Sequence, residues 1–254
     1  MIPREVQPLV DALLPEIRSA LGDNFTGAYL GGSIALGSFD PGTSDVDLLI
    51  VTERLLTDGE LEALRAVHER IPPSENTFGQ EYEAYYIDRE TMRRFGPGQL
   101  QAKVEPDHAL YVEPHRPNWV LERWLVRKNG VVVAGPDPET LIDPVSPQEM
   151  RQAAGGELAA RLEGWTSGTW PRADLLWRGS QAFEVETVCR AMFTAATGQI
   201  CSKREAVAWA LTELPARWRL LIEWSQTCRR DRTIDDLRVE EVLAFLEWAM
   251  GEVS

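Results

Sequence analysis

The stretch Tyr29–Thr52, YLGGSIALGSFDPGTSDVDLLIVT, governs the interpretation of the whole chain. A first apolar run ends in Gly31-Gly32-Ser33, a small-residue turn and a loop follow, and a second apolar run begins with Asp45 and Asp47. Residues i and i+2 of a strand project from the same face, so the two aspartates are expected to lie together. Because neighbouring carboxylates repel each other, a hard cation such as Mg²⁺ is the usual means of keeping both ionised.

The glycines before this loop have a separate consequence. They let a backbone approach another group closely, and a helix that starts at Ser33 would direct free N–H groups at an anion. An anion-binding turn beside a pair of carboxylates is what metal-assisted phosphoryl or nucleotidyl transfer requires. The structural alternative is a βαβ turn whose aspartates are simply solvated.

Gly31-Gly32-Ser33 followed by Ser44-Asp45-Val46-Asp47 resembles the GS…DxD signature of the nucleotidyltransferase superfamily that includes DNA polymerase β. A glycine-serine pair followed by one DxD is a short motif, and by itself it is only moderately specific. Here strand, turn, loop and second strand follow one another in the order that this superfamily shows. The resemblance implies a nucleotide-binding catalytic domain in the first half of the chain.

Length and composition limit the classes of function. With 254 residues the chain can form two domains, and 44% hydrophobic with 26% charged residues is ordinary for a soluble globular protein. A net charge of −14 argues against non-specific nucleic-acid binding and is compatible with a cationic substrate. No apolar segment reaches membrane-span length, so we expect no membrane partner. The three cysteines lack the spacing of a metal site. We expect a cytoplasmic protein that is a monomer or a weak dimer.

Hydrophobic periodicity predicts an α+β first domain, a mixed sheet flanked by helices. Residues 88–117 carry few periodic signals apart from a short strand at 110–112. His68 is expected on a helix surface, and His108 and His115 in loops. The other predicted elements are helices at 6–21, 55–71 and 119–128 and strands at 25–30, 47–51, 81–87 and 131–134.

A third carboxylate is expected on the strand EYEAYYI. Glu81 and Glu83 face the same way on this strand and compete for the role of metal ligand or general base. In the superfamily the third acid lies inside this strand ahead of an apolar tail, which fits Glu83 better than Glu81.

From Ser146 onward the chain contains helical stripes and no strand pattern. Ser146-Pro147-Gln148-Glu149 has the features of a helix start. We therefore predict a catalytic domain at residues 1–145 and an all-α helical bundle at residues 146–254, which contributes to nucleotide and acceptor binding.

The second half of the chain resembles one particular family within this superfamily. The segments Cys189–Ile200, Ser202-Lys203, Ala208-Trp209-Ala210 and Leu214-Pro215 are similar to the helical domain of the aminoglycoside adenylyltransferases that act on streptomycin and spectinomycin. That family binds ATP with Mg²⁺ between its two domains. The similarity implies that Gly32, Ser33 and Ser44 contact the triphosphate and that Asp45 and Asp47, with Glu83, hold Mg²⁺. Glu83 would also act as general base, and Lys203 and Arg190 would bind the phosphates.

The acceptor loop departs from the family pattern, which has acids after a tryptophan and a glycine. Here Trp177-Arg178-Gly179 is followed by Ser180-Gln181. Such acids would pair with cationic antibiotics, so their loss weakens the expectation of streptomycin in particular. Glu184 or Glu186 on the next helix is a candidate replacement, and Glu186 is also a candidate ion-pair partner of Arg190. Trp177 or Trp170 could stack on a sugar ring.

The sequence thus predicts a Mg²⁺-dependent nucleotidyltransferase. It would transfer AMP from ATP to a hydroxyl of a small, cationic aminoglycoside or aminocyclitol and release pyrophosphate. The alternatives are the same chemistry on another metabolite or on a protein hydroxyl, and a nucleotide-binding regulator without catalysis.

Overall fold

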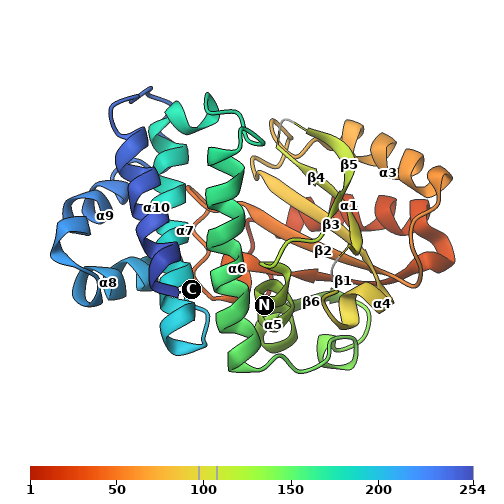
Figure 1. Cartoon of the computed structure of the whole chain (residues 1–254). Coiled ribbons are helices and arrows are strands. Elements are labelled where there is room, and N and C mark those ends of the chain that lie inside the picture. Colours follow the sequence, from red (N-terminus) through yellow and green to blue (C-terminus); the bar gives the residue numbers. More distant parts are fainter. Residues whose placement is uncertain (97, 107, 254) are drawn as a thin grey trace. The chain divides into compact units, whose positions relative to one another are not determined.

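The chain forms two compact units in a computed structural model that describes residues 1–96, 98–106 and 108–253 (Figure 1). The first unit comprises Met1–His115 and Glu122–Pro144, and the second comprises Arg116–Leu121 and Val145–Ser254. A mixed sheet with flanking helices is followed by a helical region, so the predicted α+β class is confirmed.

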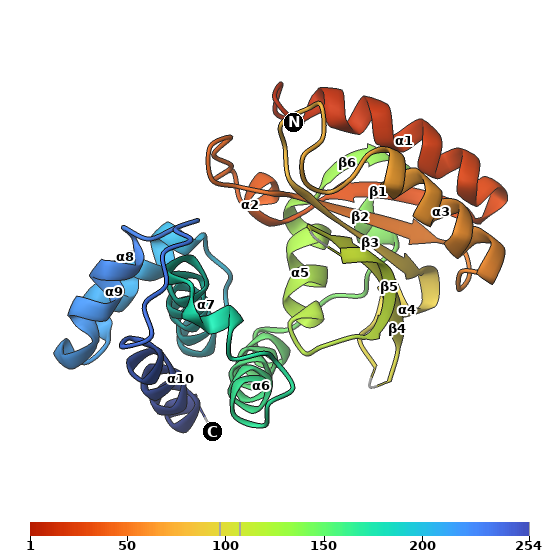
Figure 2. The same ribbon diagram turned by 90° about the horizontal axis from the view of Figure 1, so that it is seen from above.

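The described residues of the first unit form a six-stranded sheet in the order β5-β4-β3-β2-β1-β6. Strands β2 and β3 run parallel, and the other neighbouring pairs are antiparallel. Helices α1 (Gln7–Leu21) and α3 (Asp58–Arg70) lie along one face, and α5 (Trp119–Asn129) lies on the opposite side (Figure 2). The strands are β1 (Phe25–Leu30), β2 (Val46–Thr52), β3 (Tyr82–Asp88), β4 (Leu100–Glu105), β5 (His108–Pro114) and β6 (Val131–Ala134).

Burial explains why these segments form this sheet. In β2 six of the seven residues, VDLLIVT, are buried, as expected for a strand covered on both faces. In α1 the buried residues recur with helical spacing and pack on the sheet as part of one hydrophobic cluster; they are Leu9, Val10, Leu13, Ile17 and Leu21. Short helices α2 (Gly32–Ala35) and α4 (Arg89–Arg93) complete the unit.

Strand β4 lies in the region of the sequence that carries few periodic signals. It pairs with β3 on one side and with β5 on the other, and β5 extends well beyond the predicted strand at 110–112. His108 therefore belongs to a strand, and the expectation that it lies in a loop was wrong.

His68 was expected on the surface of α3, and this was wrong. Its side chain is buried between Tyr82 and Tyr86 of β3, with Nδ1 2.8 Å from the hydroxyl of Tyr82 and Nε2 2.6 Å from that of Tyr86. Because Tyr82 donates its proton to the carbonyl of Ile71, His68 must donate from Nδ1 and accept from Tyr86 at Nε2. Burial lowers the pKa of His68 to about 4, which keeps the imidazole neutral.

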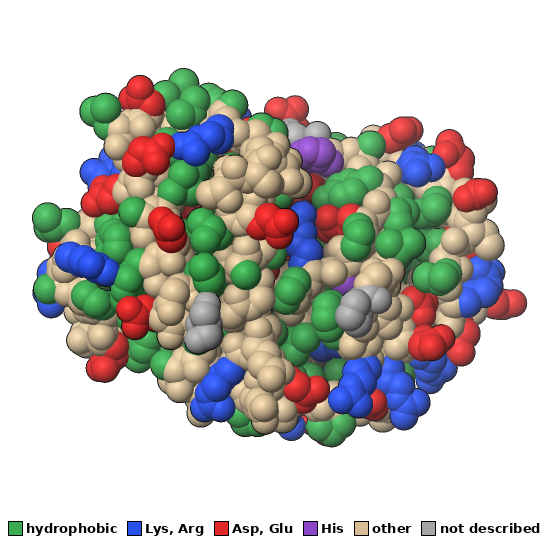
Figure 3. Space-filling view, in the orientation of Figure 1, with side chains coloured by type: hydrophobic (Ala, Val, Ile, Leu, Met, Phe, Trp, Pro, Cys, Tyr) green, Lys and Arg blue, Asp and Glu red, His purple; other side chains and the backbone are tan. Residues whose placement is uncertain are grey.

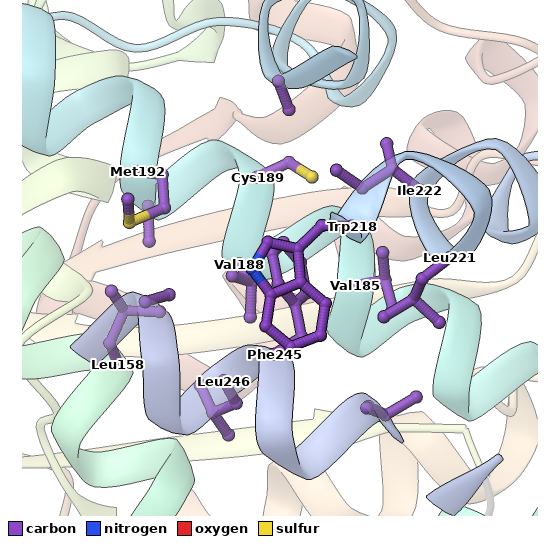
Figure 4. Close-up of a cluster of buried hydrophobic side chains, with 14 of the residues drawn as sticks. Leu158, Val185, Val188, Cys189, Met192, Trp218, Leu221, Ile222, Phe245 and Leu246 are labelled. Atoms are coloured by element: carbon purple, nitrogen blue, oxygen red, sulfur yellow. The ribbon is translucent and has the colours of Figure 1, made fainter. Parts of the chain in front are cut away.

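The second unit is built around α7 (Arg178–Thr197), which packs against the other four helices of the unit. Its core includes Trp218, whose ring centroid lies 5.0 Å from that of Phe245 among buried aliphatic side chains (Figure 4). Gly198 ends α7 in the left-handed conformation at φ 70°. The other helices are α6 (Pro147–Thr166), α8 (Lys203–Glu213), α9 (Arg219–Ser225) and α10 (Val239–Val253).

The surface charges, the lengths of the apolar helices and the state of the cysteines can be compared with what the composition predicts. Acidic and basic side chains are interspersed over the face shown in Figure 3. Within the described residues, no helix has both the length and the apolar character needed to cross a membrane. Cys189, Cys201 and Cys228 are buried free thiols.

Candidate active site

The adjacent strands β2 and β3 place Asp47 and Glu83 side by side. The two residues are Cα partners in the parallel ladder, so their side chains leave the sheet on the same face. Asp45 stands immediately before β2, close enough for its charge to act on Glu83. The structure therefore brings the three predicted carboxylates to one end of two neighbouring strands.

The glycine turn closes directly on Asp47. The amide of Gly31 donates to the carbonyl oxygen of Asp47 at 3.0 Å, and Gly32 has a φ of +46°. A Cβ atom at Gly32 would lie 1.7 Å from Oδ2 of Asp47, so no larger residue fits without moving that carboxylate. The turn's helix is α2, which has four residues and begins earlier than the expected start at Ser33.

Two serines adjoin the carboxylates. The Oγ of Ser33 is buried and has no hydrogen-bond partner among the described residues. Ser44 is held in its loop by Asp40, whose amide donates to Ser44 Oγ at 3.1 Å and whose carbonyl accepts from the Ser44 amide at 2.8 Å. A buried hydroxyl without a protein partner is compatible with a ligand contact at Ser33.

Glu83 lies in a polar cluster of its own. Its Oε2 accepts a hydrogen bond from Tyr85 and lies 3.3 Å from Nζ of Lys103. Burial raises the pKa of Glu83, and the ammonium of Lys103 and the hydrogen bond from Tyr85 oppose that rise. A carboxylate with a raised pKa is suited to accept a proton near neutral pH.

Lys103 is a residue that sequence reasoning missed, because its strand β4 was not predicted. Its ammonium also bonds to Glu105, whose second oxygen accepts from Tyr111 at 2.6 Å. Burial acts to lower the pKa of Lys103, but Glu83 and Glu105 outweigh it and the pKa is raised. The lysine is therefore charged, and the alternation of polar and apolar residues in LQAKVE was the signal that could have revealed it.

No group of three or more histidine, cysteine, aspartate or glutamate side chains within the described part of the chain is arranged to hold a metal ion. Glu83 is turned toward Lys103 and Tyr85. Asp45 and Asp47 supply the hard carboxylate oxygens that Mg²⁺ prefers, and Mg²⁺ is usually held by one or two carboxylates together with substrate phosphates. The aspartate pair therefore fits the ion without a complete protein cage.

The predicted phosphate-binding cations belong to the second unit. Lys203 begins α8, and its Nζ lies 4.8 Å from the ring centroid of Phe183. Arg190 lies on α7 with a buried Nε that has no hydrogen-bond partner among the described residues. The suggested ion pair between Arg190 and Glu186 is not found among the described residues, where Glu186 instead accepts from Nε of Arg229 at 2.7 Å.

Two acceptor candidates differ sharply in exposure. Trp177 is 40% exposed at the start of α7, where a ligand can reach it. Glu184 is 3% exposed, and its two oxygens accept from Arg161 at 2.8 and 2.6 Å. A cationic acceptor would have to displace Arg161 in order to pair with Glu184. Trp170 packs edge-on against Trp165, with ring centroids 4.9 Å apart, and contributes to the core.

Comparison with protein families gives a consistent assignment of both halves. Residues 14–93 match the family model of the nucleotidyltransferase domain, and residues 140–250 match that of the aminoglycoside adenylyltransferase C-terminal domain. The second half is thus similar to the C-terminal domain of aminoglycoside adenylyltransferases, and the first half to a nucleotidyltransferase domain. The GS…DxD turn lies in the first matched segment, and Arg190 and Lys203 lie in the second.

Individual relatives extend the likeness over most of the chain. It is 26% identical over 278 residues to the aminoglycoside (3'') (9) adenylyltransferase of Escherichia coli, which covers 98% of this chain and 95% of that protein. It is 28% identical to the enzyme of the same name from Klebsiella pneumoniae, over 89% of this chain and 86% of that one. Spectinomycin 9-adenylyltransferase of Staphylococcus aureus is 25% identical over 82% of this chain and 78% of its own length.

A solved structure shares the fold of this chain. The spectinomycin adenyltransferase of Enterococcus faecialis, crystallised with ATP and spectinomycin, superposes with a TM-score of 0.76. The match covers 97% of this chain and 98% of the other at 16% sequence identity, so it supports the fold alone.

Proposed function

We propose that this protein transfers AMP from ATP to a hydroxyl of a small cationic acceptor of the aminoglycoside or aminocyclitol type, and releases pyrophosphate. The observation that carries the proposal is the placement of Asp47 beside Glu83, with the Gly31-Gly32 turn closed on Asp47. This arrangement offers a base, a metal-binding carboxylate and a closely approaching backbone within one small region.

In the proposed reaction Glu83 takes the proton of the acceptor hydroxyl. The oxygen attacks the α-phosphorus of ATP in line, a new phosphorus–oxygen bond forms, and the bond to the β-phosphate bridging oxygen breaks. The electron pair leaves with pyrophosphate. Glu83 is suited to this role because its burial raises its pKa, while Lys103 and Tyr85 fix its position.

Mg²⁺ dependence is part of the proposal. Asp45 and Asp47 would hold the ion, and a bound Mg²⁺ would neutralise charge on the phosphates and on the leaving group. The Mg²⁺ site is supported by the donor chemistry of the two carboxylates and by the contact between Asp47 and the glycine turn. Removal of divalent ions with a chelator should therefore abolish turnover, and Mg²⁺ should restore it.

The nucleotide contacts follow the same logic. The backbone at Gly32 and the hydroxyls of Ser33 and Ser44 are the proposed triphosphate contacts of the first unit, and the unpartnered Oγ of Ser33 supports this assignment. Arg190 and Lys203 are the proposed cations, since positive groups stabilise the charge that develops on pyrophosphate.

The proposed class of acceptor is supported by the names of the matched relatives and by the net charge of the chain. The names of the matched relatives refer to aminoglycosides and spectinomycin, and the net charge of −14 favours a cationic partner through electrostatic steering. Trp177 is the proposed stacking surface for a sugar ring, because it is exposed in a region that was expected to bind the acceptor.

The test is a panel of streptomycin, spectinomycin and other aminoglycosides, each incubated with the protein, ATP and Mg²⁺, with pyrophosphate release as the measurement. Release that requires one of these acceptors supports the proposal. Thermal stabilisation by ATP and Mg²⁺ without release of pyrophosphate from ATP in the presence of any acceptor would contradict it and favour a nucleotide-binding regulator.

A further inference from the structure

The ammonium of Lys103 occupies a position that is unusual for a lysine. Its side chain is 13% exposed, lies 3.3 Å from Oε2 of Glu83, bonds to Glu105 and stands 5.2 Å from the ring centroid of Tyr85. Lysines are rarely buried to this degree unless they are paired. Here one ammonium pairs with the carboxylates of Glu83 and Glu105, which is possible because it is a compact charge with three hydrogen-bond donors.

The strands determine this placement. Lys103 of β4 is the Cα partner of Tyr85 of β3, and Glu83 lies two residues before Tyr85 on the same face. Lys103 therefore reaches Glu83 along the diagonal between neighbouring strands. Glu105 anchors the ammonium from the other side and is itself fixed by the hydroxyl of Tyr111 at 2.6 Å.

Both contacts of Glu83 involve the same oxygen. Tyr85 donates to Oε2, and Lys103 lies 3.3 Å from Oε2. Within the described residues Oε1 has no hydrogen-bond partner. The cluster thus distinguishes two chemically equivalent atoms, because it holds Oε2 and leaves Oε1 available.

We propose that Lys103 is a positioning residue that fixes Oε2 of Glu83 and thereby presents Oε1 to the acceptor hydroxyl. This inference rests on the proposed function of Glu83 as general base. Orientation of this kind acts on the chemical step, because a base displaced by about 1 Å can lose on the order of 100-fold in rate. It does not act on ATP affinity, since Lys103 contacts the base and not the residues proposed to bind the nucleotide.

A purely structural ion pair would behave differently. It would contribute to the stability of the sheet, and its removal would lower the unfolding temperature while the turnover number of the folded protein stayed unchanged. A loss of kcat without a loss of ATP affinity therefore indicates a positioning role, and an unchanged kcat indicates a purely structural one.

The test compares Lys103→Met, which keeps much of the aliphatic stem and removes the charge, with Lys103→Arg, which keeps the charge. The matched control is Lys128→Met, at an exposed lysine whose ammonium lies 3.2 Å from Glu139. For each variant kcat, the acceptor KM and the ATP dissociation constant are measured on folded protein. We expect Lys103→Met to lower kcat by about 10- to 100-fold with ATP affinity within about twofold, and Lys103→Arg to recover part of the loss.

A second variant covers the case in which Lys103→Met does not fold. Glu105→Gln leaves the lysine in place and weakens its anchor, and it should lower kcat in the same direction by a smaller factor. If these folded variants keep kcat within about twofold of an active wild type, the positioning role is overturned. A wild type that binds ATP but forms no AMP product with any acceptor would instead overturn the proposed function, and this role with it.

Discussion

Gly32 and Asp47 fit each other so closely that a Cβ atom at Gly32 would lie 1.7 Å from Oδ2 of Asp47. The amide of the preceding residue, Gly31, also donates to the carbonyl oxygen of Asp47. The glycine turn and the carboxylate that we assign to Mg²⁺ binding are therefore one structural unit. Any side chain at residue 32 must displace the carboxylate.

Gly32→Ala should raise the ATP dissociation constant, measured with Mg²⁺, and reduce turnover by about 10-fold or more, because it displaces Asp47 and strains a backbone with a φ of +46°. The matched control is Gly37→Ala. Its φ is +66°, so the backbone strain is similar, but an added Cβ would meet no atom within 4 Å. Equal effects of the two substitutions on ATP binding would show that strain, and not contact with Asp47, is responsible.

Glu83→Gln should reduce turnover by roughly 100- to 10,000-fold, the usual contribution of a general base, with ATP binding largely retained. The comparison is Glu81→Gln, at the residue that precedes β3 and that the sequence left as the alternative base. Pyrophosphate release and ATP titration are measured on both. If Glu81→Gln is the inactive variant and Glu83→Gln the active one, the base has been misassigned.

Lys203→Ala should raise the ATP dissociation constant roughly tenfold or more. The reason is the loss of a charge-assisted contact of about 1.5–3 kcal/mol with a phosphate. Isothermal titration calorimetry with ATP and Mg²⁺ measures the dissociation constant, and Lys128→Ala is the surface control. Unchanged affinity would remove Lys203 from the nucleotide site and leave it with its contact to Phe183.

The stability of the first unit should depend on pH through His68. Burial lowers its pKa from the ordinary 6.5 to about 4, so the unfolded chain binds the proton more readily between these values. The free energy of unfolding should therefore fall as the pH falls from about 6.5 to about 4, by up to roughly 3 kcal/mol.

Denaturant unfolding at several pH values measures this dependence. His68→Gln cannot titrate and should flatten the dependence over that range, whereas His108→Gln, at an exposed histidine, should leave it in place. A pH dependence that survives unchanged in His68→Gln would assign the effect to other groups.

Much of the fold follows from local patterns. Apolar runs and their breaks predicted β1, β2 and β6 closely, and the small-residue turn before Asp45 indicated the site. Strand β4 escaped prediction because its alternation of apolar and polar residues, LQAKVE, is short and lies in a segment with few other periodic signals. Its polar residues are held by cross-strand contacts, which no local pattern contains.

The candidate site shows the same limit. Spacing alone could predict that Asp45 and Asp47 lie together at the start of β2, because they are two residues apart in the sequence. It could not find Lys103, whose partner Glu83 lies on another strand, nor the pairing of Glu184 with Arg161 from a different helix. For the same reason it could not tell that His68 lies on the buried side of α3.

The central claim is tested most directly by mass spectrometry of the acceptor after incubation with ATP and Mg²⁺, for the wild type and for Asp47→Asn. The account predicts that the wild type adds the mass of one AMP to streptomycin, spectinomycin or a related aminoglycoside. It also predicts that Asp47→Asn, with a weakened metal-binding carboxylate, adds none under the same conditions. Unmodified acceptors with the wild type, or near-normal modification by Asp47→Asn, would contradict it.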